Sequence, residues 1–171
     1  MQEVKLIVLD VDGTLTDGGI LYTESGDEIK QFNVKDAIGI LACEAVGKKC
    51  MILTGRQSSI VERRANDLHI EYVYQKIGNK ELFLKEFMIQ KGYCREDILY
   101  IGDDLNDLLA MKICGKVGCP ADAAKEVIDI ANYVSGYNGG KGAVREILLN
   151  VLHEEGKYEQ AIKQLYGNCV N

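Results

Sequence analysis

The chain has 171 residues, of which 47% are hydrophobic and 27% charged, a composition typical of one soluble globular domain. It carries 20 Lys and Arg against 26 Asp and Glu, and the net charge of −6 argues against nucleic acid or an anionic membrane as a partner. No apolar stretch reaches the roughly 18 residues of a transmembrane helix, and the first residues lack a signal-peptide pattern. The six cysteines form no Cys-x-x-Cys pair, so we expect reduced thiols in a cytoplasmic protein.

Short apolar runs alternate with helical patterns along the chain. Strands are expected at residues 5–9, 49–53, 72–74, 98–101, 116–119 and 133–134. Helices are expected at residues 36–46, 57–68, 80–91, 106–114, 121–130 and 142–153, with Asn106 as an N-cap residue. This alternation predicts an α/β fold with a Rossmann-like, doubly wound and mostly parallel sheet that is covered by helices on both faces.

One segment interrupts the alternation. Residues 20–22 and 29–32 flank the turn-rich residues 24–27, which predicts a β-hairpin at about residues 18–33, close to the end of the first strand. A surface hairpin without a role is the alternative interpretation. We expect residues 1–153 to form a single domain without a large cap. Residues 154–171 would form a polar tail that is helical at 158–166 or partly disordered.

Two carboxylates, Asp10 and Asp12, follow the first strand. Gly13 allows the backbone to turn sharply after them, so both side chains can face a cleft at the carboxyl end of the sheet. Two acids this close repel each other, so the site requires a cation, a shared proton or both. An ordinary Asp-Gly turn is the competing interpretation. Later segments weigh against it, namely residues 52–56, Lys80 and residues 102–107.

Taken in order, these segments resemble the four motifs of the haloacid dehalogenase superfamily, whose members are mostly phosphohydrolases. The resemblance implies that Asp10 is a nucleophile that forms an aspartyl-phosphate. It implies that Asp12 first protonates the leaving oxygen and then activates water. The remaining catalytic and phosphate-binding positions implied by the resemblance are Thr54, Gly55, Lys80 and Asn106.

A cluster of carboxylates without His or Cys suits a hard cation with oxygen ligands, and Mg²⁺ is the expected ion. Its ligands would be the side chains of Asp10 and Asp103 and the backbone carbonyl of Asp12. Asp104 and Asp107 would orient metal-bound water from outside the direct ligands. A charge in the first turn of a helix, favoured by the helix dipole, is an equally good interpretation of Asp107.

Within the superfamily, residues 4–152 most resemble the phosphatases of 3-deoxy-D-manno-octulosonate 8-phosphate (KDO 8-phosphate), which act in lipopolysaccharide sugar synthesis. That resemblance implies a homotetramer in which the hairpin of one subunit helps to cover the site of another. A sister family acts on nine-carbon sugar acids, such as 2-keto-3-deoxynononate 9-phosphate or sialic acid 9-phosphate. Its members tend to carry Glu where this chain has Arg56, so Arg56 favours the eight-carbon substrate.

A sugar acid also carries a carboxylate, for which Arg56, Arg64 and Arg145 are the candidate partners. Arg145 lies in the glycine-rich segment 139–146, which is either an anion-binding loop or a structural turn. Two functions of other classes remain as alternatives. A phospho-accepting receiver domain also uses acids, Thr and Lys around magnesium, although in a different order along the chain. A non-catalytic oligomeric module is disfavoured because every motif position is filled.

Overall fold

The computed structural model describes residues 3–167, so Cys169 and the last part of the predicted tail lie outside the described residues. Six strands of the described chain form one sheet in the order β5-β4-β1-β6-β7-β8, and all neighbouring pairs are parallel. These strands are β1 (Leu6–Leu9), β4 (Lys49–Leu53), β5 (Tyr72–Tyr74), β6 (Ile98–Ile101), β7 (Lys116–Cys119) and β8 (Tyr133–Val134). The predicted α/β fold with a parallel sheet is confirmed.

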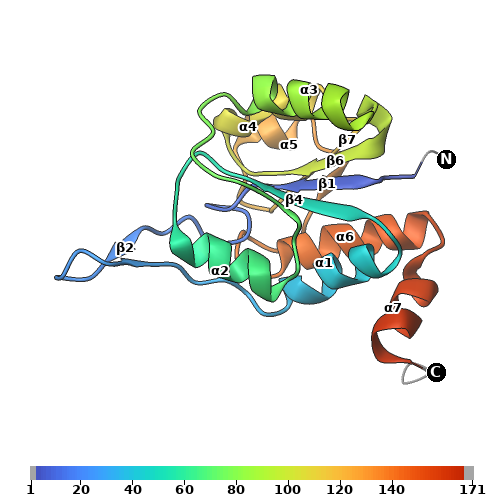
Figure 1. Cartoon of the computed structure of the whole chain (residues 1–171), viewed down its shortest axis with the longest axis horizontal. Coiled ribbons are helices and arrows are strands. Elements are labelled where there is room, and N and C mark those ends of the chain that lie inside the picture. The colour runs from blue at the N-terminus through green and yellow to red at the C-terminus, as the bar shows by residue number, and fades with distance from the viewer. Residues whose placement is uncertain (1–2, 168–171) are drawn as a thin grey trace.

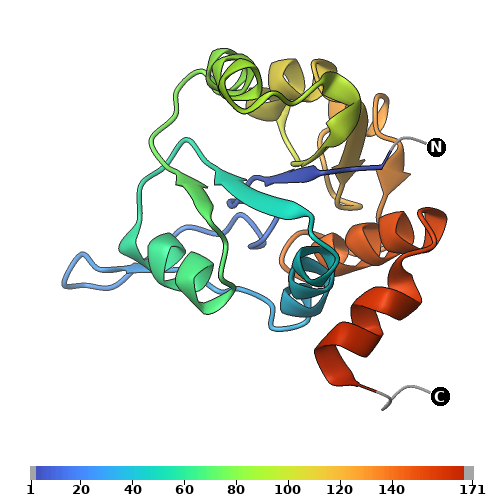
Figure 2. The same cartoon turned by 45° about the vertical axis from the view of Figure 1, so that its right-hand side comes forward.

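Helices cover both faces of this sheet (Figure 1). They are α1 (Asp36–Ala45), α2 (Ser59–Asp67), α3 (Lys80–Lys91), α4 (Leu105–Lys112), α5 (Lys125–Ile128), α6 (Ala143–Glu154) and α7 (Tyr158–Tyr166), with a 3₁₀ turn at Arg95–Asp97. Helices α3, α4 and α5 lie above the sheet in Figure 1, and α1 and α6 lie below it. In Figure 2, α7 crosses beneath α1 and α6. Among residues 3–167, no helix is long and apolar enough to cross a membrane.

The central strands carry apolar side chains on both faces of the sheet, since helices cover both faces. Side chains alternate along a strand, so Ile7 and Leu9 pack in the core under α1, α2, α6 and α7, whereas Leu6 and Val8 pack in the core under α3, α4 and α5. All four are completely buried. A strand buried in this way reads as a continuous apolar run rather than as an alternating pattern, which is why β1 could be recognised from its sequence.

Two helices differ from their predicted bounds for local reasons. Helix α4 begins at Leu105 and not after Asn106, because Asp104 is the N-cap residue and its carboxylate accepts a hydrogen bond from the Leu105 amide. The prediction of Asn106 as a cap was therefore wrong. Helix α5 is much shorter than the predicted 121–130, because the amides of Ala121 and Ala124 donate instead to the carbonyls of Tyr137 and Asp103.

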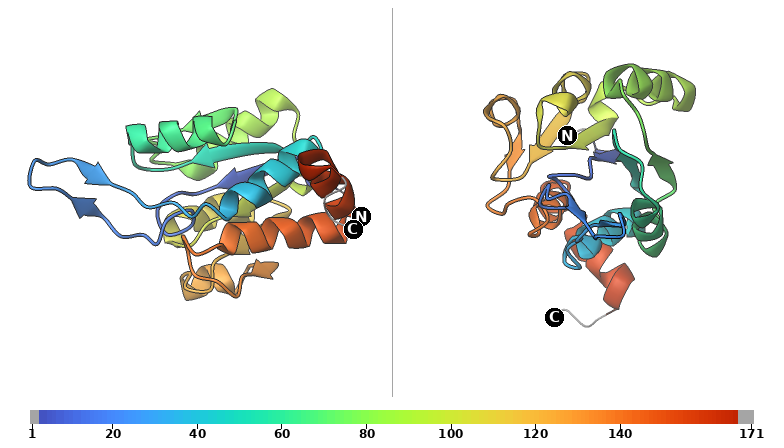
Figure 3. Two further views of the ribbon diagram at one scale, coloured as in Figure 1. Left: turned by 90° about the horizontal axis from the view of Figure 1, so that it is seen from below. Right: turned by 90° about the vertical axis from the view of Figure 1, so that its left-hand side faces the viewer.

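The predicted hairpin is present between β1 and α1. Its strands β2 (Leu21–Tyr22) and β3 (Glu28–Ile29) pair antiparallel in a separate two-stranded sheet. The left panel of Figure 3 shows the hairpin extending well beyond the body of the protein, away from the helices. At the other end of the chain, α7 is the helix expected at 158–166, and its Ala161 and Ile162 are buried.

Candidate active site

The site lies at the carboxyl edge of the three central strands. The register pairs Leu9 of β1 with Ile52 of β4 on one side and with Ile101 of β6 on the other. The residues that follow these strands therefore meet at one edge, and the Asp10 amide donates to the Ile101 carbonyl at 3.0 Å. Because the chain runs outward from β1 in both directions, this is the position where open α/β sheets bind ligands.

The turn after Asp10 requires glycine at two places. Gly13 has φ +96°, and a Cβ there would lie 2.0 Å from Asp103 Oδ2. A Cβ at Gly139 would lie 1.8 Å from the Gly13 carbonyl oxygen, so the segment 139–146 packs directly against the turn. The hydroxyl of Thr14 donates to Asp103 Oδ1 at 2.9 Å, and its carbonyl accepts from the Gly140 amide at 3.1 Å. These contacts hold the β1 and β6 loops in a fixed relative position.

The structure brings three carboxylates together at this point. Asp10, Asp103 and Asp107 each offer an oxygen atom, and these atoms lie within 4.8 Å of one another. Burial, together with the charges of Asp107 and Asp103, raises the pKa of Asp10 to about 7, although Lys80 opposes the shift. Burial and the neighbouring carboxylates likewise raise the pKa of Asp103 to about 6, against the Thr14 hydrogen bond. Excess buried negative charge on oxygen donors alone fits Mg²⁺.

Lys80 supplies the positive charge inside the cluster. It is the first residue of α3, whose N-cap Asn79 accepts from the Leu82 amide at 2.9 Å. Its side chain is almost completely buried, and its Nζ lies 2.5 Å from Asp10 Oδ1 and 2.6 Å from Asp107 Oδ1. The predicted meeting of Lys80 with the acidic residues is therefore present in the geometry.

Asp107 is completely buried and also accepts from the Tyr100 hydroxyl at 2.7 Å. It lies in the first turn of α4, as the helix-dipole interpretation requires, and its carboxylate is at the same time part of the acidic cluster. Tyr100 gave no signal in the sequence because it lies within an apolar strand. Asp104 is exposed and caps α4, and Asn106 is exposed in the first turn of that helix.

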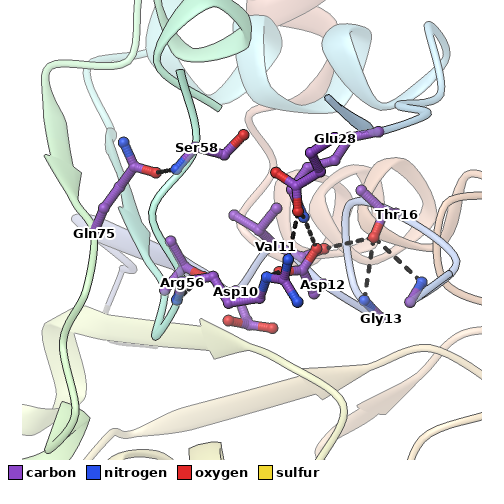
Figure 4. Close-up of polar contacts among 12 residues, drawn as sticks. Asp10, Val11, Asp12, Gly13, Thr16, Glu28, Arg56, Ser58 and Gln75 are labelled. Carbon is purple, nitrogen blue, oxygen red and sulfur yellow. Dashed lines mark hydrogen bonds and ion pairs between the residues drawn. The ribbon is translucent and has the colours of Figure 1, made fainter. Parts of the chain in front are cut away.

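Asp12 lies on the hairpin side of the turn, as Figure 4 shows. Its Oδ2 is 3.7 Å from Arg56 Nε, and its Oδ1 forms an ion pair with Lys30. Arg56 in turn donates to Glu28 Oε1 at 2.5 Å and to the Tyr22 hydroxyl at 3.4 Å. Sequence reasoning missed Lys30 and Glu28. Their signal was the i, i+2 spacing of two charges that flank Ile29 at the start of the strand expected at 29–32, which puts both charges on one face if the strand begins one residue earlier.

The remaining predicted residues are more scattered. Thr54 follows β4 and is buried, with its hydroxyl accepting from the Arg56 amide at 3.4 Å across Gly55. Arg64 of α2 lies at the base of the hairpin, where it donates to the Asn33 carbonyl at 3.2 Å and lies over the Phe32 ring.

Arg145 lines a separate cavity of about 480 Å³, whose lining does not include Asp10, Asp12 or Lys80. Its backbone amide donates to Asp36 Oδ1 at 3.0 Å. The structure therefore brings Arg56 to Asp12, whereas Arg145 faces a different hollow of the same chain.

Comparison with known proteins agrees with this geometry. The haloacid dehalogenase-like hydrolase family matches residues 68–148, which include Lys80 and the acidic loop after β6. The 3-deoxy-D-manno-octulosonate 8-phosphate phosphatase of Escherichia coli K12 is 37% identical over 160 residues, covering 94% of this chain and 85% of the relative. Its counterpart from Haemophilus influenzae is 38% identical over 157 residues, covering 92% and 87%.

Solved structures show the same similarity. A Moraxella catarrhalis 3-deoxy-D-manno-octulosonate 8-phosphate phosphatase, in complex with magnesium, phosphate and KDO, superposes with a TM-score of 0.91 at 34% identity, covering 96% of this chain and 94% of that one. The cobalt-bound Haemophilus influenzae enzyme superposes with a TM-score of 0.87 at 36% sequence identity, and the match covers 94% of this chain and 97% of that one. The chain therefore belongs to the haloacid dehalogenase-like hydrolases and, within them, to the family of the 3-deoxy-D-manno-octulosonate 8-phosphate phosphatases.

Proposed function

We propose that the protein is a Mg²⁺-dependent phosphatase that hydrolyses KDO 8-phosphate to KDO and phosphate, a step of lipopolysaccharide sugar synthesis in the cytoplasm. One observation carries the proposal: the buried Asp10 and Lys80 and the half-buried Asp103 form a cluster at the carboxyl edge of the sheet. The near full-length similarity to KDO 8-phosphate phosphatases, one of them in complex with KDO, supports the choice of substrate.

Asp10 is the proposed nucleophile. Its carboxylate attacks the phosphorus atom, forms an aspartyl-phosphate and so divides one difficult displacement into two easier steps. Lys80, at 2.5 Å, orients this carboxylate and offsets the negative charge that accumulates when a phosphate approaches. Asp107 pairs with Lys80 and accepts a hydrogen bond from the Tyr100 hydroxyl, so these two residues fix the position of the Lys80 ammonium group beside Asp10.

Asp12 is the proposed acid and base. It gives a proton to the sugar oxygen as the bond from phosphorus to that oxygen breaks, and it then removes a proton from the water that hydrolyses the aspartyl-phosphate. Its side chain is 21% exposed, in contrast to the buried Asp10. Asp12 is therefore accessible from the side where the leaving group and the water arrive.

We propose Asp10, Asp103 and the backbone carbonyl of Asp12 as the Mg²⁺ ligands, with Asp104 and Asp107 outside them. When bound, the ion neutralises phosphate oxygens and polarises the phosphoryl group. Thr54, Gly55 and Asn106 would hold the phosphate from the neighbouring loops, because Thr54 and Gly55 follow β4 beside Asp10 and Asn106 lies in the first turn of α4. The raised pKa values of Asp10 and Asp103 support a cation at this position.

The sugar carboxylate would meet Arg56 or Arg64 on the hairpin side of the cleft. Arg64 uses one nitrogen for the Asn33 carbonyl, so its other donors remain for a ligand. Arg145 is the weakest of the three candidates because it lines a different cavity. Arg56 also supports the eight-carbon acid over the nine-carbon acids of the sister family.

We further propose that the active form is a homotetramer in which the hairpin at residues 18–33 completes a neighbouring site. The hairpin projects from the body of the protein, where polar side chains would be expected. It nevertheless exposes the apolar side chains of Ile20, Leu21, Tyr22 and Ile29. Such a contiguous exposed patch is typical of a protein–protein interface. Light scattering tests this, and a fully active monomer at assay concentration would contradict it.

The experiment for the activity is phosphate release from a panel of sugar phosphates, with Mg²⁺ and with a chelator. We expect KDO 8-phosphate to have the highest kcat/KM and turnover to require the metal. Markedly faster hydrolysis of 2-keto-3-deoxynononate 9-phosphate or sialic acid 9-phosphate would move the protein to the sister family. Absence of steady turnover, even of p-nitrophenyl phosphate, would instead favour a receiver domain or a non-catalytic module.

A further inference from the structure

We propose that Lys30 is a positioning residue for the reaction: from the hairpin of its own chain, it fixes the carboxyl group of Asp12 for proton transfer to the leaving oxygen. This assignment rests on the proposed function. It gives the hairpin a role within its own subunit, in addition to any role at a neighbouring site.

The contact is buried and specific. The Lys30 side chain is only 2% exposed, although it belongs to a hairpin that projects from the protein. Its Nζ pairs with Asp12 Oδ1 and lies 3.5 Å from Glu28 Oε1. A lysine is rarely buried to this degree unless it is paired, and fixing its long side chain costs conformational entropy that the pairing must offset. A solvated surface lysine would not be held in this way.

In the second strand of the hairpin and the residue after it, charged side chains face the protein and an apolar side chain faces solvent, the reverse of the usual arrangement. Neighbouring side chains of a strand point to opposite faces, and here Glu28 and Lys30 turn toward the catalytic turn while Ile29, between them, is 48% exposed. The Glu28 side chain is 17% exposed. The face that a surface hairpin would normally make apolar is therefore charged and directed at Asp12.

The charges around Asp12 form a closed set of two cations and two carboxylates. Lys30 contacts Asp12 Oδ1, and Arg56 Nε lies 3.7 Å from Asp12 Oδ2. Glu28 binds Arg56 at 2.5 Å and faces Lys30 at 3.5 Å. The set carries no net charge once Asp12 has given up its proton and is a carboxylate, and Lys30 then holds that carboxylate as its direct counter-charge. The Arg56 side chain is 38% exposed, so the buried Lys30 is the more rigid of the two holders.

This geometry assigns different tasks to the two oxygen atoms of Asp12. Lys30 holds Oδ1 directly, whereas Arg56 approaches Oδ2 only to 3.7 Å, so Oδ2 is the oxygen that carries the proton toward the sugar oxygen. As the bond from phosphorus to that oxygen breaks, the proton passes from Oδ2 to the leaving oxygen and Asp12 becomes a carboxylate. When water then attacks the phosphoryl group on Asp10, Asp12 takes up a proton from that water. Lys30 transfers no proton in either step and acts only by orientation.

A residue that orients the proton donor has a specific kinetic signature. A poor leaving group depends on protonation, whereas a good one such as p-nitrophenolate leaves with little help. We therefore propose to measure kcat/KM for a series of substituted phenyl phosphates whose leaving groups differ in acidity. The compounds share one ring, so their binding is closely matched. The variants are Lys30→Met, which keeps the stem but removes the ammonium group, Asp12→Asn and the control Lys112→Met, an exposed lysine on α4.

We expect Lys30→Met to lose roughly 10- to 100-fold on the least acidic phenol and less than about threefold on p-nitrophenyl phosphate, within the contribution of general acid catalysis. Asp12→Asn should steepen the dependence on leaving-group acidity in the same direction, and Lys112→Met should leave it unchanged. A misfolded fraction lowers the apparent kcat/KM for every substrate by the same factor. The slope of log kcat/KM against leaving-group pKa is therefore independent of how much of the protein folds.

Equal losses of Lys30→Met across the series, or no loss, would overturn the assignment while leaving the phosphatase intact. Wild-type protein that turned over none of these esters would overturn the proposed function and this assignment with it.

Discussion

Lys80 Nζ lies 2.5 Å from Asp10 Oδ1, although 69 residues separate them along the chain and both are nearly inaccessible to solvent. This ion pair connects the start of α3 to the end of β1 at the centre of the sheet. Asp107 and Asp103 complete the cluster from the β6 side. One lysine among three carboxylates leaves excess negative charge in the cluster. The cluster is therefore suited to bind a metal cation, which can in turn hold a phosphate.

Lys80→Met should reduce kcat by about 10²–10³, the usual cost of removing one preorganised charge from a site of this kind. It also leaves Asp10 and Asp107 without their shared partner. Lys85→Met is the matched control, because Lys85 is on the same helix and its side chain is 50% exposed in a pair with Glu81. Phosphate release measured for both variants tests this, and equal activities would remove Lys80 from the mechanism.

Arg64→Ala should raise KM for KDO 8-phosphate by roughly 10- to 100-fold, the value of one charge-assisted hydrogen bond. Hydrolysis of p-nitrophenyl phosphate, which has no carboxylate, should change by less than about twofold. Arg63→Ala is the control, because Arg63 is the exposed neighbour on α2. Comparable losses on both substrates would instead mean that Arg64 acts by anchoring the hairpin through Asn33 and Phe32.

Glu155→Gln should lower the free energy of unfolding by about 3–5 kcal/mol, because it leaves a buried lysine without its counter-charge. Glu155 pairs with Lys48 and accepts from the Val4 amide at 2.8 Å, and both side chains of the pair are 2% exposed. Glu71→Gln is the control, since its pair with Lys49 is about half exposed and should contribute less than about 1 kcal/mol. Urea denaturation distinguishes them, and equal midpoints would show that the buried pair adds nothing.

Asp97 predicts a pH dependence of stability. Burial would raise its pKa, but bonds from Lys5 and Cys94 prevail and lower the pKa of Asp97 to about 2. A depressed pKa means that this stability is complete above about pH 4 and is lost as the pH falls toward 2. The difference in urea midpoint between wild type and Asp97→Asn should therefore be constant from pH 7 to 5 and shrink below 4. A difference that stayed constant down to pH 3 would contradict the shift.

Much of the site could be predicted because its position follows from strand order. Asp10 and Thr54 come directly after an apolar run and Asp103 follows one after Gly102, and parallel strands place such ends at one edge. Lys80 was predicted from its resemblance to a motif, since nothing in its own surroundings distinguishes it from a surface lysine. The sheet and its covering helices followed from hydrophobic patterns that are uninterrupted because both faces are buried.

The parts that could not be predicted depend on contacts between distant residues. Lys30 meets Asp12, and Glu28 meets Lys30 and Arg56, only because of the direction in which the hairpin leaves the turn, and a strand pattern does not specify that direction. Tyr100 looks like any core aromatic residue until Asp107 is placed beside it. The start of α4 was predicted wrongly because both Asp104 and Asn106 are good N-cap residue types. Asp104 is the one whose carboxylate accepts the capping hydrogen bond from the Leu105 amide. Residues 121–124 are not helical because the amides of Ala121 and Ala124 donate to the distant carbonyls of Tyr137 and Asp103.

The most direct test of the account is to trap the covalent intermediate. Wild-type protein mixed with KDO 8-phosphate and Mg²⁺, and quenched in acid within the first turnover, should carry one phosphoryl group on the peptide that contains Asp10. The linkage should be sensitive to hydroxylamine, as an acyl phosphate is, and Asp10→Asn should carry none while keeping its fold by circular dichroism. A phosphoryl group on another residue, or an Asp10→Asn variant that releases phosphate at a near wild-type rate, would contradict the central claim.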